Sequence, residues 1–174
     1  MTNRPATRLY MPDRLAEGAT VLLDAAQAHR LRDVLRLKPG AAIAVFNARD
    51  GEWLCRLSGP DLAVERCLRA PQPEGDLWLL FAPLRRGRLD WLVEKASELG
   101  VAALVPVLTA RTQPQPFNRE RLAALAVAAA EQSERLSVPE IRDPAPLDQV
   151  LRAWPAARRI VMCDESGQGM PIAA

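Results

Sequence analysis

The sequence predicts two structural parts, a small β-barrel followed by a parallel α/β sheet. Residues 1–70 contain short stretches in which apolar and polar residues alternate, the two-residue period of a strand with one buried face. Residues 77–108 contain two apolar runs on either side of a helical pattern. Strand, helix and strand within roughly thirty residues form a βαβ unit, whose two strands are parallel.

The first part is expected to hold five short strands and one helix, which suggests a small barrel. The helix begins at Asp24, where Gln27 completes a capping-box pattern, and Pro39-Gly40 ends it. Its expected core face is Ala28, Leu31 and Leu35. Asp50-Gly51 is a hairpin turn signal between two of the strands. The expected strands cover residues 7–11, 21–23, 42–46, 52–58 and 62–69.

Residues 71–76, rich in proline and glycine, are the expected linker to a second part at 77–174. Residues 77–84 and 101–108 read as strands buried on both faces, and 159–163 as a third buried strand. The helix between the first two ends at Gly100, a residue suited to a left-handed C-cap. Its apolar stripe is Leu89, Leu92, Val93, Ala96 and Leu99. Further along the chain we expect a loop at 114–117, a helix from Asn118 to Leu136 and a short helix at 147–154.

Composition excludes several classes of protein. With 49% hydrophobic residues and a net charge of +2, the chain can bury a core and is not disordered by composition. Its three cysteines form no C-x-x-C pair, which argues against a disulfide scaffold or a zinc site. The N-terminus lacks the apolar core of a signal peptide, and no stretch is long enough to span a membrane. We expect a cytoplasmic protein with no metal and no membrane partner.

Two basic clusters are candidate phosphate-binding sites. His29, Arg32 and Arg36 share one face of the first predicted helix, with Arg8 nearby in sequence. They could contact RNA phosphates or form an ordinary solvated face. The turn after residue 84 contains three arginines, Arg85, Arg86 and Arg88, but a single glycine, so its side chains could bind phosphate while its backbone cannot cradle a dinucleotide. A solvated basic turn is the alternative.

Two polar groups on helices leave their roles open. Asp90, Glu94 and Glu98 stack at helical spacing, where like charges repel by a few tenths of a kcal/mol per pair. Arginines of another segment could compensate them, or the row could simply be exposed. At the end of the alanine-rich helix, Glu131 and Arg135 have the favourable i, i+4 order with Gln132 beside them. They could face a site or solvent.

Five segments, in this order, resemble one family: HRLRDVLRLKPG at 29–40, FNARDGEW at 46–53, VEKASELGV at 93–101, PVLTART at 106–112 and EQSERLSVPEI at 131–141. The chain resembles the ribosomal RNA small subunit methyltransferase E family, whose members join a PUA-like barrel to a SPOUT-class methyltransferase domain. The resemblance implies transfer of a methyl group from S-adenosylmethionine to N3 of a uridine in 16S ribosomal RNA, by a cytoplasmic homodimer.

The resemblance also implies roles for individual residues. Arg8, His29 and Arg36 would face RNA in the PUA-like part, and Lys95 and Arg111 would do so in the second part. Glu98, Glu131, Gln132 and Arg135 would be polar residues close to the active site. No residue is identified as the catalytic base.

The family's glycine-rich GPEGG-like loop and its LGPRxLRxET-like segment, which hold the donor, do not occur in the chain. We therefore expect an incomplete SPOUT-like domain whose donor contacts lie beyond Ala174. The chain alone is then expected to bind S-adenosylmethionine weakly, to be inactive and to expose apolar surface. Residues 167–169 read as a surface loop. The alternatives are a non-catalytic RNA-binding module that uses the barrel alone, or an unrelated small α/β protein.

Overall fold

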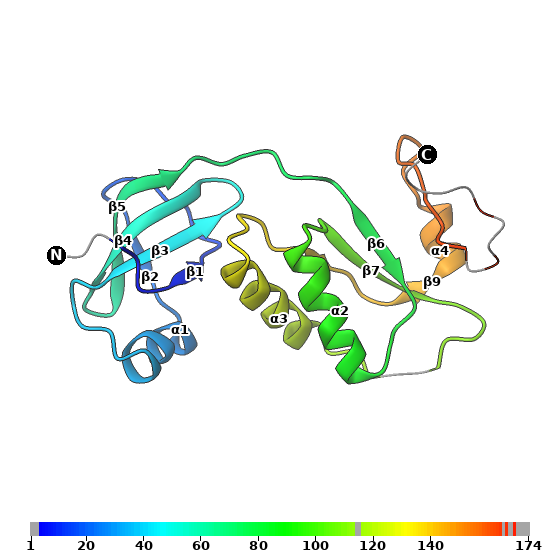
Figure 1. The fold of residues 1–174 in the computed structure, drawn as a ribbon, viewed down its shortest axis with the longest axis horizontal. Helices are drawn as coiled ribbons and strands as arrows, with labels where there is room; N and C mark the ends of the chain where they lie inside the picture. The colour runs from blue at the N-terminus through cyan, green and yellow to red at the C-terminus, as the bar shows by residue number, and fades with distance from the viewer. Residues whose placement is uncertain (1–3, 114–115, 165, 167–168, 170–174) are drawn as a thin grey trace.

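The computed structural model describes residues 4–113, 116–164, 166 and 169. The molecule is elongated and consists of two parts (Figure 1). The N-terminal part is a curled sheet with one helical segment, and the α/β part is a parallel sheet with helices on its faces. Residues 70–77, which contain no helix or strand, run between them as an extended segment.

The N-terminal part is a curled, open five-stranded sheet with the order β1-β3-β4-β5-β2. Strand β1 pairs in parallel with β3, and the other neighbours are antiparallel. The predicted small barrel is confirmed in this half-barrel form, with the strands β1 and β2 at the two ends of the order. The strands are β1 (Arg8–Tyr10), β2 (Thr20–Leu22), β3 (Ala42–Asn47), β4 (Gly51–Ser58) and β5 (Asp61–Arg69).

One helical segment covers this sheet. The helix α1 (Ala25–His29) begins at the predicted N-cap, because the Asp24 carboxylate accepts a hydrogen bond from the Gln27 backbone N–H and the Gln27 side-chain oxygen accepts one from the Asp24 backbone N–H. The segment then widens to a π-helix, η1 (Arg30–Val34), instead of continuing as an α-helix to residue 38. Leu31 is fully buried, but Leu35 is exposed, so the predicted core face is only partly correct.

The βαβ unit is confirmed. Strands β6 (Trp78–Phe81) and β7 (Ala103–Leu108) are parallel neighbours joined by helix α2 (Arg86–Glu98). Two short strands, β8 (Glu140–Ile141) and β9 (Ala145–Pro146), pair in parallel with β7 and were not predicted. The prediction that 77–84 is buried on both faces is wrong. β6 is shorter and half-buried, because it is an edge strand with β7 as its neighbour.

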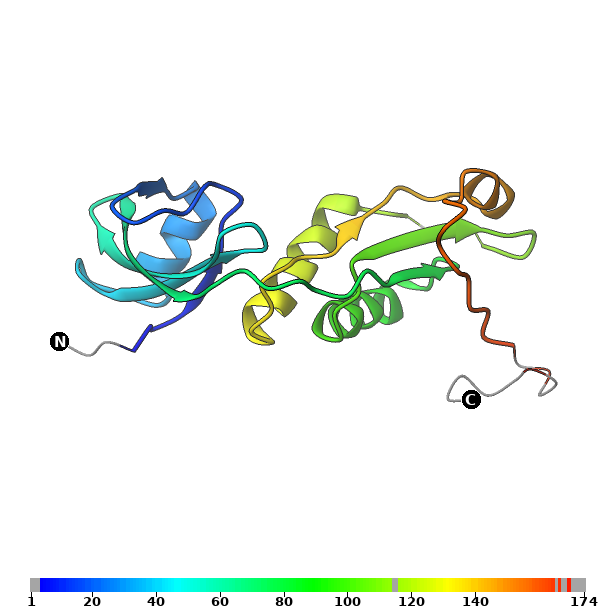
Figure 2. The same ribbon diagram turned by 90° about the horizontal axis from the view of Figure 1, so that it is seen from above.

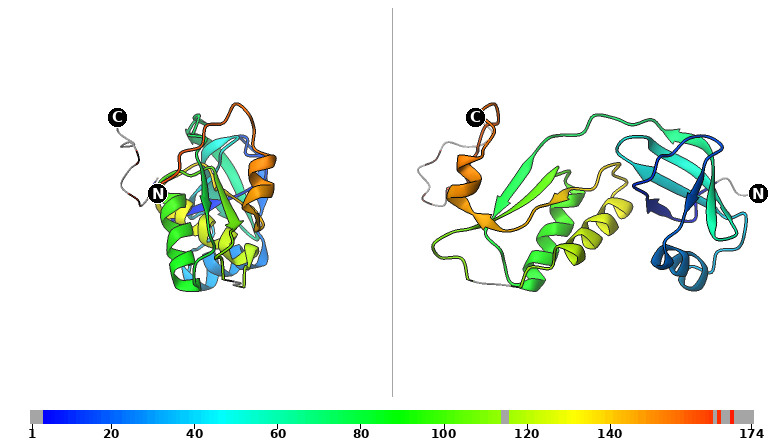
Figure 3. Two further views of the ribbon diagram at one scale, coloured as in Figure 1. Left: turned by 90° about the vertical axis from the view of Figure 1, so that its right-hand side faces the viewer. Right: turned by 180° about the vertical axis from the view of Figure 1, so that it is seen from behind.

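The helices cover both faces of the α/β sheet (Figure 2 and Figure 3). Helices α2 and α3 (Arg119–Gln132) pack together on one face, where Leu89, Leu104 and Leu122 share a core. The short α4 (Leu147–Arg152) covers the other face. The predicted N-cap at Asn118 is confirmed, since its side chain accepts a hydrogen bond from the Arg121 amide, but α3 ends four residues before Leu136.

The predicted stripe of α2 is buried except at Leu92, which is half-buried, and at its end. Leu99 is 84% exposed because it lies past the last helical residue, where the chain turns through Gly100 at a φ of +90°. That left-handed φ confirms the predicted C-cap.

The prediction of a third buried strand at 159–163 is wrong. These residues form neither helix nor strand, and Met162 is 80% exposed. An apolar run becomes a strand only where a neighbour takes up its backbone hydrogen bonds, and no described strand pairs with this one. Two predicted loops lie partly outside the described residues. The residues outside are Pro114 and Gln115 of the first loop, and Gly167 and Gln168 of the second. No helix among the described residues is both long and apolar enough to cross a membrane.

Candidate functional site

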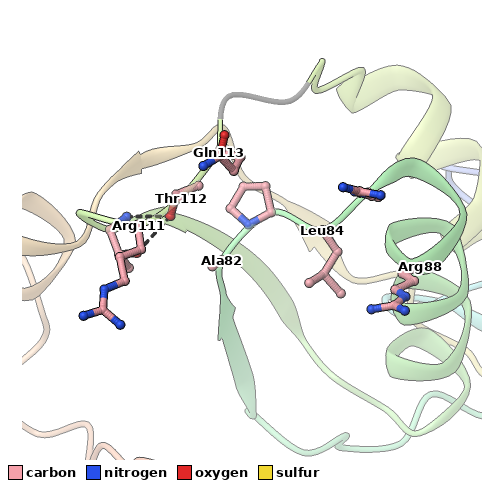
Figure 4. A pocket seen from close by; sticks show the side chains of 9 residues that line it. Ala82, Leu84, Arg88, Arg111, Thr112 and Gln113 are labelled. Atoms are coloured by element: carbon pink, nitrogen blue, oxygen red, sulfur yellow. Dashed lines mark hydrogen bonds between the residues drawn. The ribbon is translucent and has the colours of Figure 1, made fainter.

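A cavity of about 530 Å³ lies at the carboxyl ends of β6 and β7. In parallel α/β sheets this edge is where ligands usually bind. The segment that follows β6 forms one wall, and the turn that follows β7 forms the other (Figure 4). The lining residues are Ala82, Pro83, Leu84, Arg85, Arg88, Thr109, Arg111, Thr112 and Gln113.

Three arginines give this cavity its chemistry. Arg85 is the N-cap residue of α2, Arg88 lies in the first turn of that helix, and Arg111 lies in the turn after β7. This second turn is fixed by Thr109 and Thr112, whose backbone and hydroxyl groups exchange hydrogen bonds of 2.8 and 3.0 Å. All three arginines are exposed, and no described acidic residue lies within ion-pair distance of their guanidinium groups.

Guanidinium groups without internal acidic partners are suited to bind an anion, and arginine matches the geometry of a phosphate. The N-terminus of α2, a helix of thirteen residues, adds partial positive charge at the same edge. Among the described lining residues there is no carboxylate, histidine or cysteine. The cavity can therefore bind an anionic group, and it offers no general base of its own.

The structure thus brings Arg85 and Arg111, which are predicted from different segments, to one cavity. Arg88, the third arginine of the same predicted basic turn, also lines the cavity. Arg86 begins α2 and is not a lining residue. The proximity of the two segments follows from the parallel pairing of β6 and β7, which a charge pattern does not reveal.

Lys95 and Glu98 do not line this cavity. The Lys95 ammonium lies 2.8 Å from the Glu98 carboxylate and 2.9 Å from that of Glu94, and these hydrogen bonds raise the pKa of Lys95. Asp90, the first of the acidic row, is paired with Arg121 of α3, whose two hydrogen bonds lower the pKa of Asp90. Arg121 of α3 therefore compensates the negative charge of Asp90. Lys95, which belongs to α2 itself, compensates the charges of Glu94 and Glu98.

Arg8 lies where the two parts meet. Its guanidinium donates to the carbonyl oxygens of Ala130, Glu131 and Arg135 at the end of α3, at 3.0 to 3.1 Å. Its Nε lies 2.5 Å from the Glu52 carboxylate. These contacts occupy the side chain within the protein. A contact between Arg8 and RNA stays a prediction.

The polar group predicted at the end of α3 does not line the cavity, and only one of its three residues is exposed to solvent. Glu131 is buried and accepts hydrogen bonds from the Arg30 side chain and the Tyr10 amide. Arg135 is bound to Glu74 of the extended segment, and Gln132 is exposed. Burial tends to raise the pKa of Glu74, but hydrogen bonds from Ser137 and Arg135 lower it below its usual value.

The prediction that His29, Arg32 and Arg36 share one helical face is wrong. The π-helix changes the pitch after His29, and Arg36 lies beyond its end with a left-handed φ of +51°. All three side chains are exposed. His29 Nδ1 lies 2.7 Å from an Asp33 carboxylate oxygen, and Arg32 donates to the Gly59 carbonyl. Their contact with RNA stays a prediction.

No group of three or more histidine, cysteine or acidic residues that could hold a metal ion occurs in the described part of the chain.

The chain matches two family models. Residues 70–173 match an RNA methyltransferase domain, and residues 23–63 match an RNA methyltransferase PUA domain. The first match covers more than half of the chain and includes the cavity.

Relatives support the same assignment. Ribosomal RNA small subunit methyltransferase E of Rickettsia conorii is 30% identical over 83% of this chain and 62% of its own length. The Synechocystis protein of that name is 33% identical over 79% of this chain and 47% of its own length. The chain therefore spans about half to two thirds of the relatives it matches.

A solved structure shows the same fold. It is the methyltransferase E of Neisseria gonorrhoeae bound to S-adenosyl methionine, with a TM-score of 0.73 and 26% identity over 86% of this chain and 66% of that one. Both family models, both relatives and this structure name one group of enzymes. The chain belongs to the ribosomal RNA small subunit methyltransferase E family of RNA methyltransferases.

Proposed function

We propose that this protein takes part in the methylation of 16S ribosomal RNA, at N3 of a uridine, with S-adenosylmethionine as donor and in the cytoplasm. The observation that carries the proposal is the cavity with Arg85, Arg88 and Arg111 in the part that matches an RNA methyltransferase domain. The relatives are named as ribosomal RNA methyltransferases, which suggests the RNA substrate. The neisserial structure contains bound S-adenosyl methionine, which suggests the donor.

In this proposal the three cavity arginines bind the phosphates that flank the target nucleotide. Phosphate contacts fix the position of a nucleic acid without reading its sequence. The exposed His29, Arg32 and Arg36 of the N-terminal part provide a second RNA contact. RNA that reaches both would be held at two points along the molecule.

The cavity suits the RNA better than it suits the donor. S-adenosylmethionine carries a positive sulfonium beside the methyl group that it transfers, and three guanidinium groups would repel that charge. No acidic residue among the described lining residues offsets the repulsion. The described cavity is thus assigned to RNA, and the donor is left without a site among these residues.

The direct test is methyl transfer by the full-length gene product. The enzyme is incubated with methyl-labelled S-adenosylmethionine and small ribosomal subunits that lack the modification. We expect label at a single uridine. Because a methyl group on N3 blocks base pairing, reverse transcription should stop at that nucleotide.

The Arg85→Ala and Arg111→Ala variants should lower the incorporation of label. The Arg119→Ala variant, which removes an exposed arginine of α3 outside the cavity, should leave it unchanged. Label on another nucleotide would contradict the uridine assignment. RNA binding without transfer would favour the alternative of a non-catalytic RNA-binding module.

We also propose that the protein forms a homodimer. Ile160, Val161 and Met162 expose large apolar side chains, and exposed apolar surface often marks an interface between proteins. Sedimentation equilibrium should give twice the mass of one chain at micromolar concentration, and a single-chain mass would contradict the proposal.

A further inference from the structure

The C-terminal end of α3 meets the edge of the N-terminal sheet (Figure 1). The last carbonyl groups of a helix have no partners within it and carry partial negative charge. In this molecule Arg8 of the N-terminal part donates to the carbonyl oxygens of Ala130 and Glu131 in the last turn of α3, and to that of Arg135 three residues beyond the helix.

Arg8 is also held in place by two residues of the N-terminal part, to which it belongs. The Glu52 carboxylate accepts from its Nε at 2.5 Å, and its guanidinium carbon lies 4.1 Å from the centroid of the Phe46 ring. Both charged side chains are 14% exposed. A planar guanidinium fixed in this way can donate in a defined direction, which an ammonium group cannot do.

Glu131 makes the reciprocal contact. Its side chain, 3% exposed, accepts from Arg30 at 2.6 Å and from the Tyr10 amide at 3.2 Å. Both donors belong to the N-terminal part, whereas Glu131 belongs to α3. Removing the donors would leave a buried carboxylate without these partners, which is costly. The position of each part therefore depends on the other.

The rest of the described interface is small and includes one further polar contact, a hydrogen bond of 2.6 Å from Arg69 to the Glu134 carbonyl. Phe46, Ala130 and Leu136 form an apolar cluster across it, with Tyr10 and Val138 at its margin. Apolar contacts have little directional preference, and the covalent connection at 70–77 contains no helix or strand. Parts joined in this way move relative to each other unless a specific interface prevents it.

We propose that Arg8 and Glu131 are positioning residues that fix the angle between the N-terminal sheet and the α/β part. The angle determines whether one RNA can contact the sheet and the arginine cavity at once. The cavity lies at the carboxyl ends of β6 and β7, and these strand ends point away from the N-terminal part in the view from behind (Figure 3). The role of Arg8 and Glu131 in RNA binding rests on the proposed function. Their role in fixing the angle between the two parts does not depend on it.

Distance measurement between two spin labels tests the angle directly. Exposed Cys67 of β5 takes one label, and Trp91→Cys on the exposed side of α2 takes the other, in a Cys163→Ser background. Cys55 stays unlabelled, because it is buried and burial raises the pKa of its thiol to about 12. We expect one narrow distance distribution.

The Arg8→Ala and Glu131→Gln variants should broaden this distribution, and Arg8→Lys should broaden it less. The matched control is Arg56→Ala, which removes an arginine paired with Glu65 inside the N-terminal sheet and should leave the distribution narrow. If circular dichroism shows that Arg8→Ala is unfolded, Glu131→Gln and Arg8→Lys decide the question. Distributions as narrow as that of the parent would overturn the proposal.

The same variants separate this inference from the proposed function. Affinity for the small ribosomal subunit should fall in Arg8→Ala and recover in part in Arg8→Lys. If the parent protein binds no ribosomal RNA, the proposed function fails, while the distance measurement still decides the role of Arg8 and Glu131. Broadened distances with unchanged RNA affinity would overturn the link between the angle and RNA binding.

Discussion

At the scale of single residues, Gly100 is a position where two independent reasons disfavour a side chain. Its φ of +90° lies in the left-handed region, and an added Cβ would lie 1.8 Å from Nη1 of Arg135. We predict that Gly100→Ala lowers the free energy of unfolding by roughly 1 to 2 kcal/mol or more. Urea denaturation followed by circular dichroism measures the change.

Gly87 is the matched control. It lies in the first turn of α2, and an added Cβ would have no neighbour within 4 Å. Gly87→Ala should therefore stabilise the protein by up to about 1 kcal/mol, since alanine favours the helix. Equal losses in both variants would mean that the conformation at Gly100 is not the cause.

At the scale of elements, Asp50 holds the β3–β4 hairpin to the chain before it. A hydrogen bond from Arg49 lowers the pKa of Asp50 to about 2 against the opposing effect of burial, and the Leu15 amide and Asn47 contribute. Because the folded pKa lies below the ordinary 3.8, the stabilisation is present above about pH 4 and is lost as the pH falls toward 2.

We predict that Asp50→Asn lowers the free energy of unfolding at pH 7 by roughly 1 to 2 kcal/mol. The difference from the parent should shrink between pH 4 and pH 2, which denaturant titrations at several pH values would measure. A difference that stays constant over this range would contradict the assignment.

The pair of Asp90 and Arg121 links α2 to α3 through two hydrogen bonds of 2.7 and 2.8 Å. Both side chains are about 30% exposed, so water screens part of their attraction. A double-mutant cycle with Asp90→Ala and Arg121→Ala should give a coupling energy of roughly 0.5 to 1 kcal/mol. A coupling energy near zero would mean that the pair does not stabilise the contact between α2 and α3.

At the scale of the whole molecule, the cavity arginines should act on RNA through charge. We predict that Arg85→Ala and Arg111→Ala each weaken RNA binding and each reduce the slope of log affinity against log salt by about 1. Arg119→Ala, outside the cavity, should change neither quantity as much. Filter binding at several salt concentrations measures both, and an unchanged slope would place the phosphates elsewhere.

The sequence by itself determined several helix ends, the βαβ unit and the family. Asp24, Asn118 and Gly100 predicted helix ends correctly, because capping depends on neighbouring residues alone. The βαβ unit followed from apolar runs of the right length. The segments at 93–101 and 131–141 carried the resemblance that the family models confirm.

Only the tertiary structure decided which residues meet. Nothing in the spacing of Arg8 and Glu131 indicates that they lie at one interface, since the contact depends on how the two parts pack. The same holds for Arg85 and Arg111, which share a cavity because β6 and β7 are parallel neighbours. The apolar run at 159–163 failed as a strand for the same physical reason, because a strand requires a partner and its own sequence does not supply one.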